Sequence, residues 1–85
     1  MPNKNYVKGR RKEYRIVRSH KALGEISFRS AGSHSPVDVV AINTKDKTIS
    51  LIQAKPDSMS ANAKKKLEEE NAGLNGTFEV RFLVI

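Results

Sequence analysis

The sequence predicts an α/β fold in which helices pack on a mixed β-sheet, with the elements in the order αβββαβ. Two segments carry apolar residues at the three- and four-residue spacings of helices, and short β-branched apolar runs lie between and after them. Three strands in succession, followed by a strand behind a helix, imply a mixed sheet with helices packed on it. The 85 residues form one domain, residues 1–85, with a small core.

The first half of the chain reads as a helix followed by a short strand. Apolar residues around Val17 recur at helical spacing, which predicts a helix over residues 8–22, and Gly24 is a suitable stop just after it. Residues 25–30, "EISFRS", alternate weakly and read as a strand. The following "AGSHSP" has the composition of a turn.

The second half reads as a hairpin, a helix and a last strand. Residues 37–43 and 48–55 are rich in apolar residues and are separated by the polar "TKDK", which predicts a hairpin. Residues 58–71 carry a narrow apolar stripe at helical spacing, and Gly73 fits the end of this helix. Residues 77–85, "TFEVRFLVI", alternate as a final strand does.

Composition excludes several classes of protein. The chain has no Cys, so disulfides and thiolate metal sites are excluded, and only oxygen-rich or His-based metal sites remain. No window approaches 18 uncharged apolar residues, which argues against a transmembrane helix. The N-terminal segment lacks the apolar core of a signal peptide, so we expect a cytoplasmic, intracellular protein.

The positive charge lies in the first third of the chain. Residues 1–29 hold nine Lys and Arg and two Glu, which gives +7, whereas residues 30–85 hold seven of each sign. Such asymmetry is the footprint expected of a protein that binds a phosphate backbone. Charge alone also fits an anionic membrane as the partner, or simply a solvated, highly charged helix.

Polar groups stand in the two apolar runs of the predicted hairpin. Asp38 heads the first run, and the second ends on "LIQAK", which contains Gln53 and Lys55. If Asn43 pairs with Thr48, the antiparallel register places Asp38 opposite Gln53, with about 5 Å between their β-carbons. A slip of one residue would break this pairing. The carboxylate, the amide and the ammonium would then converge at one end of the hairpin.

A third acid borders the apolar face of the first predicted helix. Glu13 stands four residues before Val17, about 40° from it around the helix. It could reach Lys55 or share a cation with the hairpin residues. An equally good interpretation is a surface acid that pairs with a neighbouring base: Lys8, Arg10 or Lys12.

These groups suit the hydrolysis of a phosphodiester. Mg²⁺ takes oxygen ligands and keeps several waters, so one or two carboxylates suffice to hold it. The metal would polarise a phosphoryl oxygen and lower the pKa of an attacking water. Lys55 could orient that water or stabilise charge on the phosphorus. Spacing alone slightly favours a simple ion pair between Asp38 and Lys55 at the edge of the sheet.

Three segments carry a resemblance to a known family. "KGRRKEYRIV", "RSAGSHSPVDVVAI" and "LIQAK" occur in this order and resemble the N-terminal helix, the Arg-Ser-x-Gly-Ser segment with its aspartate, and the (D/E)-x-K strand of the archaeal-type Holliday junction resolvases. That family belongs to the PD-(D/E)XK nuclease superfamily, whose restriction-endonuclease-like core has the order αβββαβ. The resemblance covers residues 6–57 well and the rest only by element order.

The resemblance implies a Mg²⁺-dependent endodeoxyribonuclease, with Mn²⁺ as an alternative metal. Glu13, Asp38, Gln53 and the backbone carbonyl of Ala54 would hold the metal, and Lys55 would assist catalysis. The serine-bearing loop of the family matches Ser30 and Ser33, and the activity of the family depends on a serine there.

The resemblance also implies the partners of this chain. The substrate would be branched or junction DNA, gripped by Lys8, Arg10, Arg11 and Arg29, with Ser30 beside the DNA. Because a four-way junction needs two symmetric cuts, the protein would act as a homodimer in DNA recombination and repair. No small-molecule cofactor and no membrane partner are implied.

The chain departs from the family pattern at Gln53, which replaces a carboxylate and should lower the affinity for metal. A second hypothesis is therefore a non-catalytic nucleic-acid-binding module on the same fold, with a degenerate metal site. A third is a small basic accessory protein of a ribosome or virus, in which Asp38 and Lys55 are merely paired.

Overall fold

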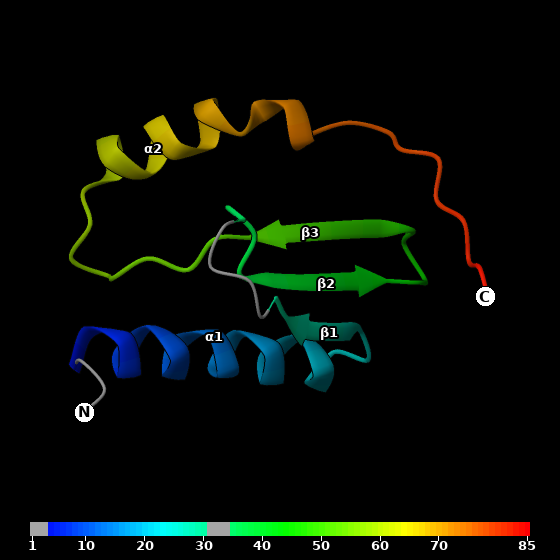
Figure 1. Cartoon of the computed structure of the whole chain (residues 1–85), viewed down its shortest axis with the longest axis horizontal. Helices are drawn as coiled ribbons and strands as arrows, with labels where there is room; N and C mark the ends of the chain where they lie inside the picture. Colours follow the sequence, from blue (N-terminus) through cyan, green and yellow to red (C-terminus); the bar gives the residue numbers. More distant parts are fainter. Residues whose placement is uncertain (1–3, 31–34) are drawn as a thin grey trace.

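The computed structural model describes residues 4–30 and 35–85, with side chains described from residue 9 onward. Figure 1 shows α1 next to β1 on one side of the three-stranded sheet and α2 beyond β3 on the other side in this view. The elements are α1 (Lys4–Ala22), β1 (Ile26–Arg29), β2 (Val39–Asn43), β3 (Thr48–Ile52), α2 (Ala61–Glu70) and a 3₁₀ turn, η1 (Ala72–Leu74).

The first helix begins earlier than predicted and ends where predicted. Helix α1 starts at Lys4 rather than at residue 8, since residues 4–8 contain no proline or glycine that would end the helix there. At its C-terminal end the backbone N–H of Gly24 donates to the carbonyl of Lys21 at 2.9 Å. Gly24 has φ +84°, a left-handed conformation that glycine adopts without steric cost.

The predicted hairpin register is confirmed. Strands β1, β2 and β3 form an antiparallel sheet in sequence order, and Asn43 pairs with Thr48 as expected. The loop between β2 and β3 is closed by the Asn43 side chain, whose Oδ1 accepts hydrogen bonds from the backbone N–H groups of Lys45 (3.1 Å) and Asp46 (2.8 Å). This local capping is typical of asparagine in turns, and it sets the register of the whole hairpin.

The core lies between α1 and one face of the sheet. Val39 and Ala41 of β2 are fully buried, and Val17 of α1 is 7% exposed. Ser27 of β1 is also buried, and its hydroxyl donates to the carbonyl of Val40 at 3.0 Å, so its burial leaves no unpaired donor. Val17, one of the residues of the predicted apolar pattern, therefore lies on the buried face of α1, whereas Tyr14 and Leu23 are exposed.

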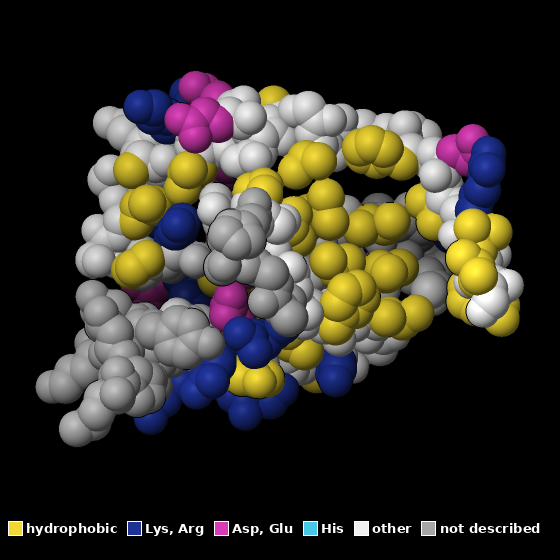
Figure 2. Space-filling model, in the orientation of Figure 1, with side chains coloured by type: hydrophobic (Ala, Val, Ile, Leu, Met, Phe, Trp, Pro, Cys, Tyr) yellow, Lys and Arg dark blue, Asp and Glu magenta, His cyan; other side chains and the backbone are white. Residues whose placement is uncertain are grey.

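The opposite face of the sheet is apolar and uncovered. Figure 2 shows hydrophobic side chains gathered over the sheet on this side. The exposed fractions there are 55% for Ile26, 49% for Phe28, 46% for Ile49 and 41% for Leu51. Cross-strand pairing aligns Ile26 with Ile42 and Ile42 with Ile49, so they share one face. A sheet face of this kind normally packs against another element.

Helix α2 begins at a serine cap and ends before the predicted stop. Ser60 is the N-cap residue, and its hydroxyl accepts a hydrogen bond from the backbone N–H of Ala63 at 3.1 Å. The helix ends at Glu70, and Gly73 lies in η1 instead of acting as the cap. The apolar stripe of α2 includes Leu67, which faces the groove beside β3.

The expectation of a final strand was wrong for this structure. Residues 77–85 have neither helical nor strand structure, and each of their apolar side chains is at least 58% exposed. Gly76, with φ +133°, precedes this segment. A strand needs a partner for its backbone hydrogen bonds, which alternation alone does not supply. Without this segment the sheet is wholly antiparallel rather than mixed.

The α/β class is therefore confirmed as a helix, a three-stranded antiparallel sheet and a second helix. Within residues 4–30 and 35–85, no helix is long and apolar enough to span a membrane.

Candidate functional site

Asp38 lies across from Gln53, as the register requires. The backbone N–H of Asp38 donates to the carbonyl of Ile52 at 2.8 Å, and the Asp38 carboxylate Oδ2 accepts from the backbone N–H of Ala54 at 2.9 Å. These two bonds bracket Gln53 on the neighbouring chain segment. At this end of the β2–β3 pair the Asp38 carboxylate, rather than a backbone carbonyl, accepts the hydrogen bond from the Ala54 backbone N–H.

One end of the sheet gathers further groups around Asp38. The backbone N–H of Ser30, which follows β1, donates to the carbonyl of Asp38 at 2.8 Å. Asp38, Gln53, Ala54 and Ser30 are all half-buried. Two of the predicted site residues cannot be placed: Ser33 lies outside the described residues, and so does the side chain of Lys8.

Lys55 is held through its backbone by α1. The ammonium Nζ of Lys12 donates to the carbonyl of Lys55 and to Asp57 Oδ1, the latter at 2.8 Å. The hydrogen bond and the charge of Lys12 lower the pKa of the Asp57 carboxyl below its usual value. The alternative of a simple ion pair between Asp38 and Lys55 is not among the ion pairs of the described residues, and Asp38 accepts a hydrogen bond from the Ala54 backbone.

Glu13 pairs with Arg29, which neither interpretation of the sequence named as its partner. Its carboxylate accepts a hydrogen bond from Arg29 Nη2 at 3.2 Å, and the two side chains are 16% and 24% exposed. The Arg29 guanidinium also lies over the Tyr14 ring, 4.5 Å from its centroid. Burial disfavours the charged form of Arg29, but its interactions with Glu13 and Tyr14 outweigh this and raise its pKa. Arg29, a predicted DNA contact, is therefore engaged within the protein.

The donors at Asp38 fit a hard divalent cation only in part. No three His, Cys, Asp or Glu side chains of the described residues lie close enough together to hold a metal ion. One Asp38 oxygen is engaged by Ala54, and Oδ1 accepts no hydrogen bond from a described residue. Mg²⁺ usually takes one or two carboxylates and keeps several waters, and Asp38 supplies one such carboxylate at this end of the sheet.

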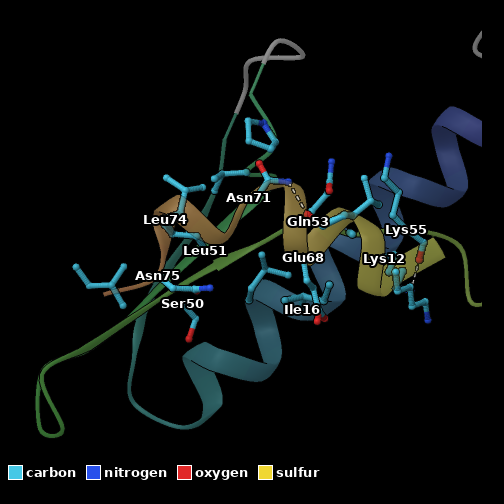
Figure 3. Close-up of a pocket in the computed structure, with 17 residues that line it drawn as sticks. Lys12, Ile16, Ser50, Leu51, Gln53, Lys55, Glu68, Asn71, Leu74 and Asn75 are labelled. Atoms are coloured by element: carbon cyan, nitrogen blue, oxygen red, sulfur yellow. Dashed lines mark hydrogen bonds between the residues drawn. The ribbon is translucent and has the colours of Figure 1, made fainter. Parts of the chain in front are cut away.

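A groove of about 740 Å³ runs along β3 and reaches this region. It is lined on one side by residues 49–55 and on the other by α2 and η1, through Leu67 and Leu74. Figure 3 shows Lys12 and Lys55 beside each other at one end of the groove, with Gln53 between them and Asn71. A substrate that enters from this end would meet the amide of Gln53 and the two lysines together.

The predicted DNA-binding residues are distributed along α1. Arg10 and Arg11 are exposed and lie on different sides of the helix by its 3.6-residue period. Arg11 borders a shallow hollow on α1, together with Lys12, Tyr14, Arg15 and Arg18. Arg15 and Arg18 were not predicted from the sequence to bind DNA. Their positions four and seven residues after Arg11, on the same side of a helix, could have indicated them.

Lys12 and Asp57 are the other residues that the sequence did not single out. Lys12 stood in a run of bases where nothing marked it as different from its neighbours. Its proximity to Lys55 joins residues 43 positions apart in the chain. Such a contact depends on how α1 lies against the sheet, which the pattern of either segment alone does not reveal.

Comparison of the chain with protein-family models, with curated proteins and with solved structures finds no match.

Proposed function

We propose that this protein is a metal-dependent endonuclease that hydrolyses phosphodiester bonds in structured DNA. The observation that carries the proposal is the position of Asp38, held opposite Gln53 by hydrogen bonds to both neighbours of Gln53. Lys55 follows two residues later, which brings a carboxylate, an amide and an ammonium to one end of the hairpin. The excess charge of +7 in residues 1–29 suits a polyanionic substrate.

In this proposal each group has a separate task. Asp38 and Gln53, with the Ala54 carbonyl, would hold a Mg²⁺ ion, which would activate water and polarise a phosphoryl oxygen. The Lys55 ammonium would donate hydrogen bonds to the non-bridging oxygens of the phosphate, where negative charge develops. Lys12 would keep Lys55 in place by holding its backbone carbonyl.

The proposed fold is the restriction-endonuclease-like core. Two observations support this. The described elements follow the order helix, three strands, helix, which is the order of the first five elements of that core. The outer edge of β3 has no partner strand among the described residues, which leaves an edge where a further strand can pair.

Homodimerisation is part of the proposal, since paired cuts across a branched DNA need two sites. It is supported by the uncovered apolar face of the sheet, formed in part by Phe28, Ile49 and Leu51. Burial of such a face by a second copy would add stability to a small core.

One observation favours a second candidate, the non-catalytic DNA-binding module. Glu13, which the resemblance assigns to the metal, is bound by Arg29 rather than placed beside Asp38. With Gln53 in place of a carboxylate, the site then offers a single negative charge. The two candidates share DNA binding and differ in whether metal ions produce cleavage.

The test is cleavage of a labelled four-way junction and of a linear duplex with the same arms, with Mg²⁺, with Mn²⁺ and with chelator. We expect paired, metal-dependent cuts in the junction. Asp38→Asn should abolish cleavage and leave binding intact, because a metal ligand is lost while the basic helix remains. The matched control is Glu69→Gln, which neutralises an exposed acid of α2 and should leave cleavage unchanged.

Gln53→Glu should shift the Mg²⁺ titration to lower concentrations, since it restores a charged ligand. Retained cleavage by Asp38→Asn would refute the site. Tight junction binding without cleavage at any metal concentration would establish the binding module instead.

A further inference from the structure

We propose that three arginines on one side of α1, Arg11, Arg15 and Arg18, form a row that binds consecutive phosphates of a DNA backbone. We call them the arginine row. The inference rests on the proposed function and deepens it by assigning the surface on which the DNA lies. Arg15 and Arg18 are assigned no role by the sequence or by the resemblance.

The spacing of the arginine row suits one strand of DNA. Residues four and seven positions after Arg11 lie within about 40° of it around a helix, and the row extends about 10 Å along the axis. Successive phosphates of one strand rise about 3.4 Å along a duplex, so the row is long enough to meet about three of them. All three side chains are exposed, and they border one shallow hollow with Lys12 and Tyr14.

The acids of the same region do not neutralise the row. Glu13 is bound by Arg29 and Glu25 by His20, the latter at 3.3 Å, and both carboxylates are largely buried. These are the two acids of residues 1–29. One acid from another segment, Asp57, pairs with Lys12 at 2.8 Å, and the charge of Arg15 also lowers its pKa. Three arginines and Lys12 thus face this single exposed carboxylate, so the surface keeps an excess of positive charge, and Figure 2 shows basic side chains gathered along the edge of the molecule where α1 runs.

Lys12 connects the arginine row to the candidate site. It borders the hollow of the row and also the groove along β3, where its ammonium holds the Lys55 carbonyl. A backbone that lies on the row thus passes Lys12 toward Lys55 and Gln53. The row and the site act on one continuous path, which favours a nucleic-acid strand over isolated phosphate ions.

An anionic membrane is the alternative polyanion, and the packing of α1 argues against it. A helix that binds a membrane surface presents its apolar face to the lipid. The apolar face of α1 is already used, since Val17 is 7% exposed against the sheet. The row would meet lipid headgroups by charge alone.

The test compares two charge-matched double variants of the full chain. Arg15→Gln with Arg18→Gln removes two charges from the row. Lys65→Gln with Lys66→Gln removes two charges from exposed positions of α2. The dissociation constant for a four-way junction is measured in chelator between 0.05 and 0.3 M salt (about the range in which phosphate contacts dominate). Circular dichroism checks that both variants are folded.

We expect the slope of log K against log salt to fall by about 1.8 for the arginine variant, at about 0.9 per lost phosphate contact. At about 0.1 M salt this corresponds to roughly 60-fold weaker binding, whereas the lysine variant should keep the wild-type slope. Equal slopes for the two variants would overturn the arginine row. Binding of the wild-type protein to vesicles with anionic lipid but not to DNA would also overturn it.

Because binding is measured without metal, the experiment tests the arginine row independently of the proposed nuclease activity. Cleavage by the wild-type protein with no effect on the slope leaves the nuclease and removes the row. A reduced slope in a protein that never cleaves supports the row and removes the nuclease.

Discussion

Replacement of Glu13 by glutamine tests whether this acid is a structural partner of Arg29 or a metal ligand. In the structure its carboxylate accepts a hydrogen bond from Arg29 at 3.2 Å, and both side chains are mostly buried. Among the described residues, Arg29 Nε is buried and already lacks a partner. Glu13→Gln would leave the Arg29 guanidinium without a counter-charge in this environment.

The expected cost follows from these contacts. A hydrogen bond between charged groups contributes about 1.5–3 kcal/mol, and the loss of one partner of a fully buried pair costs about 3–5 kcal/mol. Because Arg29 is 24% exposed and glutamine keeps one acceptor oxygen, we expect a loss of about 2 kcal/mol in unfolding free energy. For a domain of this size that lowers Tm by about 8–16 °C.

Thermal and urea unfolding by circular dichroism would measure this change against the exposed control Glu69→Gln. The double variant Glu13→Gln with Arg29→Gln removes the uncompensated charge and should lose less than the sum of the two single variants. Suppose instead that Glu13→Gln matches the control within about 0.5 kcal/mol but abolishes metal-dependent cleavage. The carboxylate would then be a ligand in the working enzyme, and our reasoning about the Arg29 pair would be refuted.

Two further predictions concern the Lys12 contact and the core. Lys12 lowers the pKa of Asp57, so this ion pair stabilises the fold above the usual Asp pKa and is lost as the pH falls through the lowered value. In an NMR titration Lys12→Met should raise the Asp57 pKa, whereas Lys66→Met should leave it unchanged. Val39→Ala, at a fully buried position, should cost about 2–3 kcal/mol in urea unfolding. Val80→Ala, at a position that is 70% exposed, should stay within about 0.5 kcal/mol of wild type, and an equal loss would contradict the observed core.

Local patterns determined most of the secondary structure. The helix stop at Gly24, the strand β1 that follows it and the hairpin closed by Asn43 all depend on residues close together in the chain. The turn also determined the register, so the position of Asp38 opposite Gln53 could be derived before the structure was known. Hydrogen bonds within a few residues are favourable in almost any surrounding fold, which is why such features can be predicted.

Contacts between distant segments were decided only by the tertiary structure. The sequence placed Glu13 beside the apolar face of α1 but did not indicate that β1 would present Arg29 to it. In the sequence Lys12 does not differ from the other bases around it. Only the packing of α1 against the sheet places its ammonium at the Lys55 carbonyl. For residues 77–85 the alternation predicted a strand, yet a strand forms only where a free edge meets it, and in this structure the segment lies apart from β3. A sequence pattern specifies which side of an element is apolar; the element that covers that side is selected by packing of the whole chain.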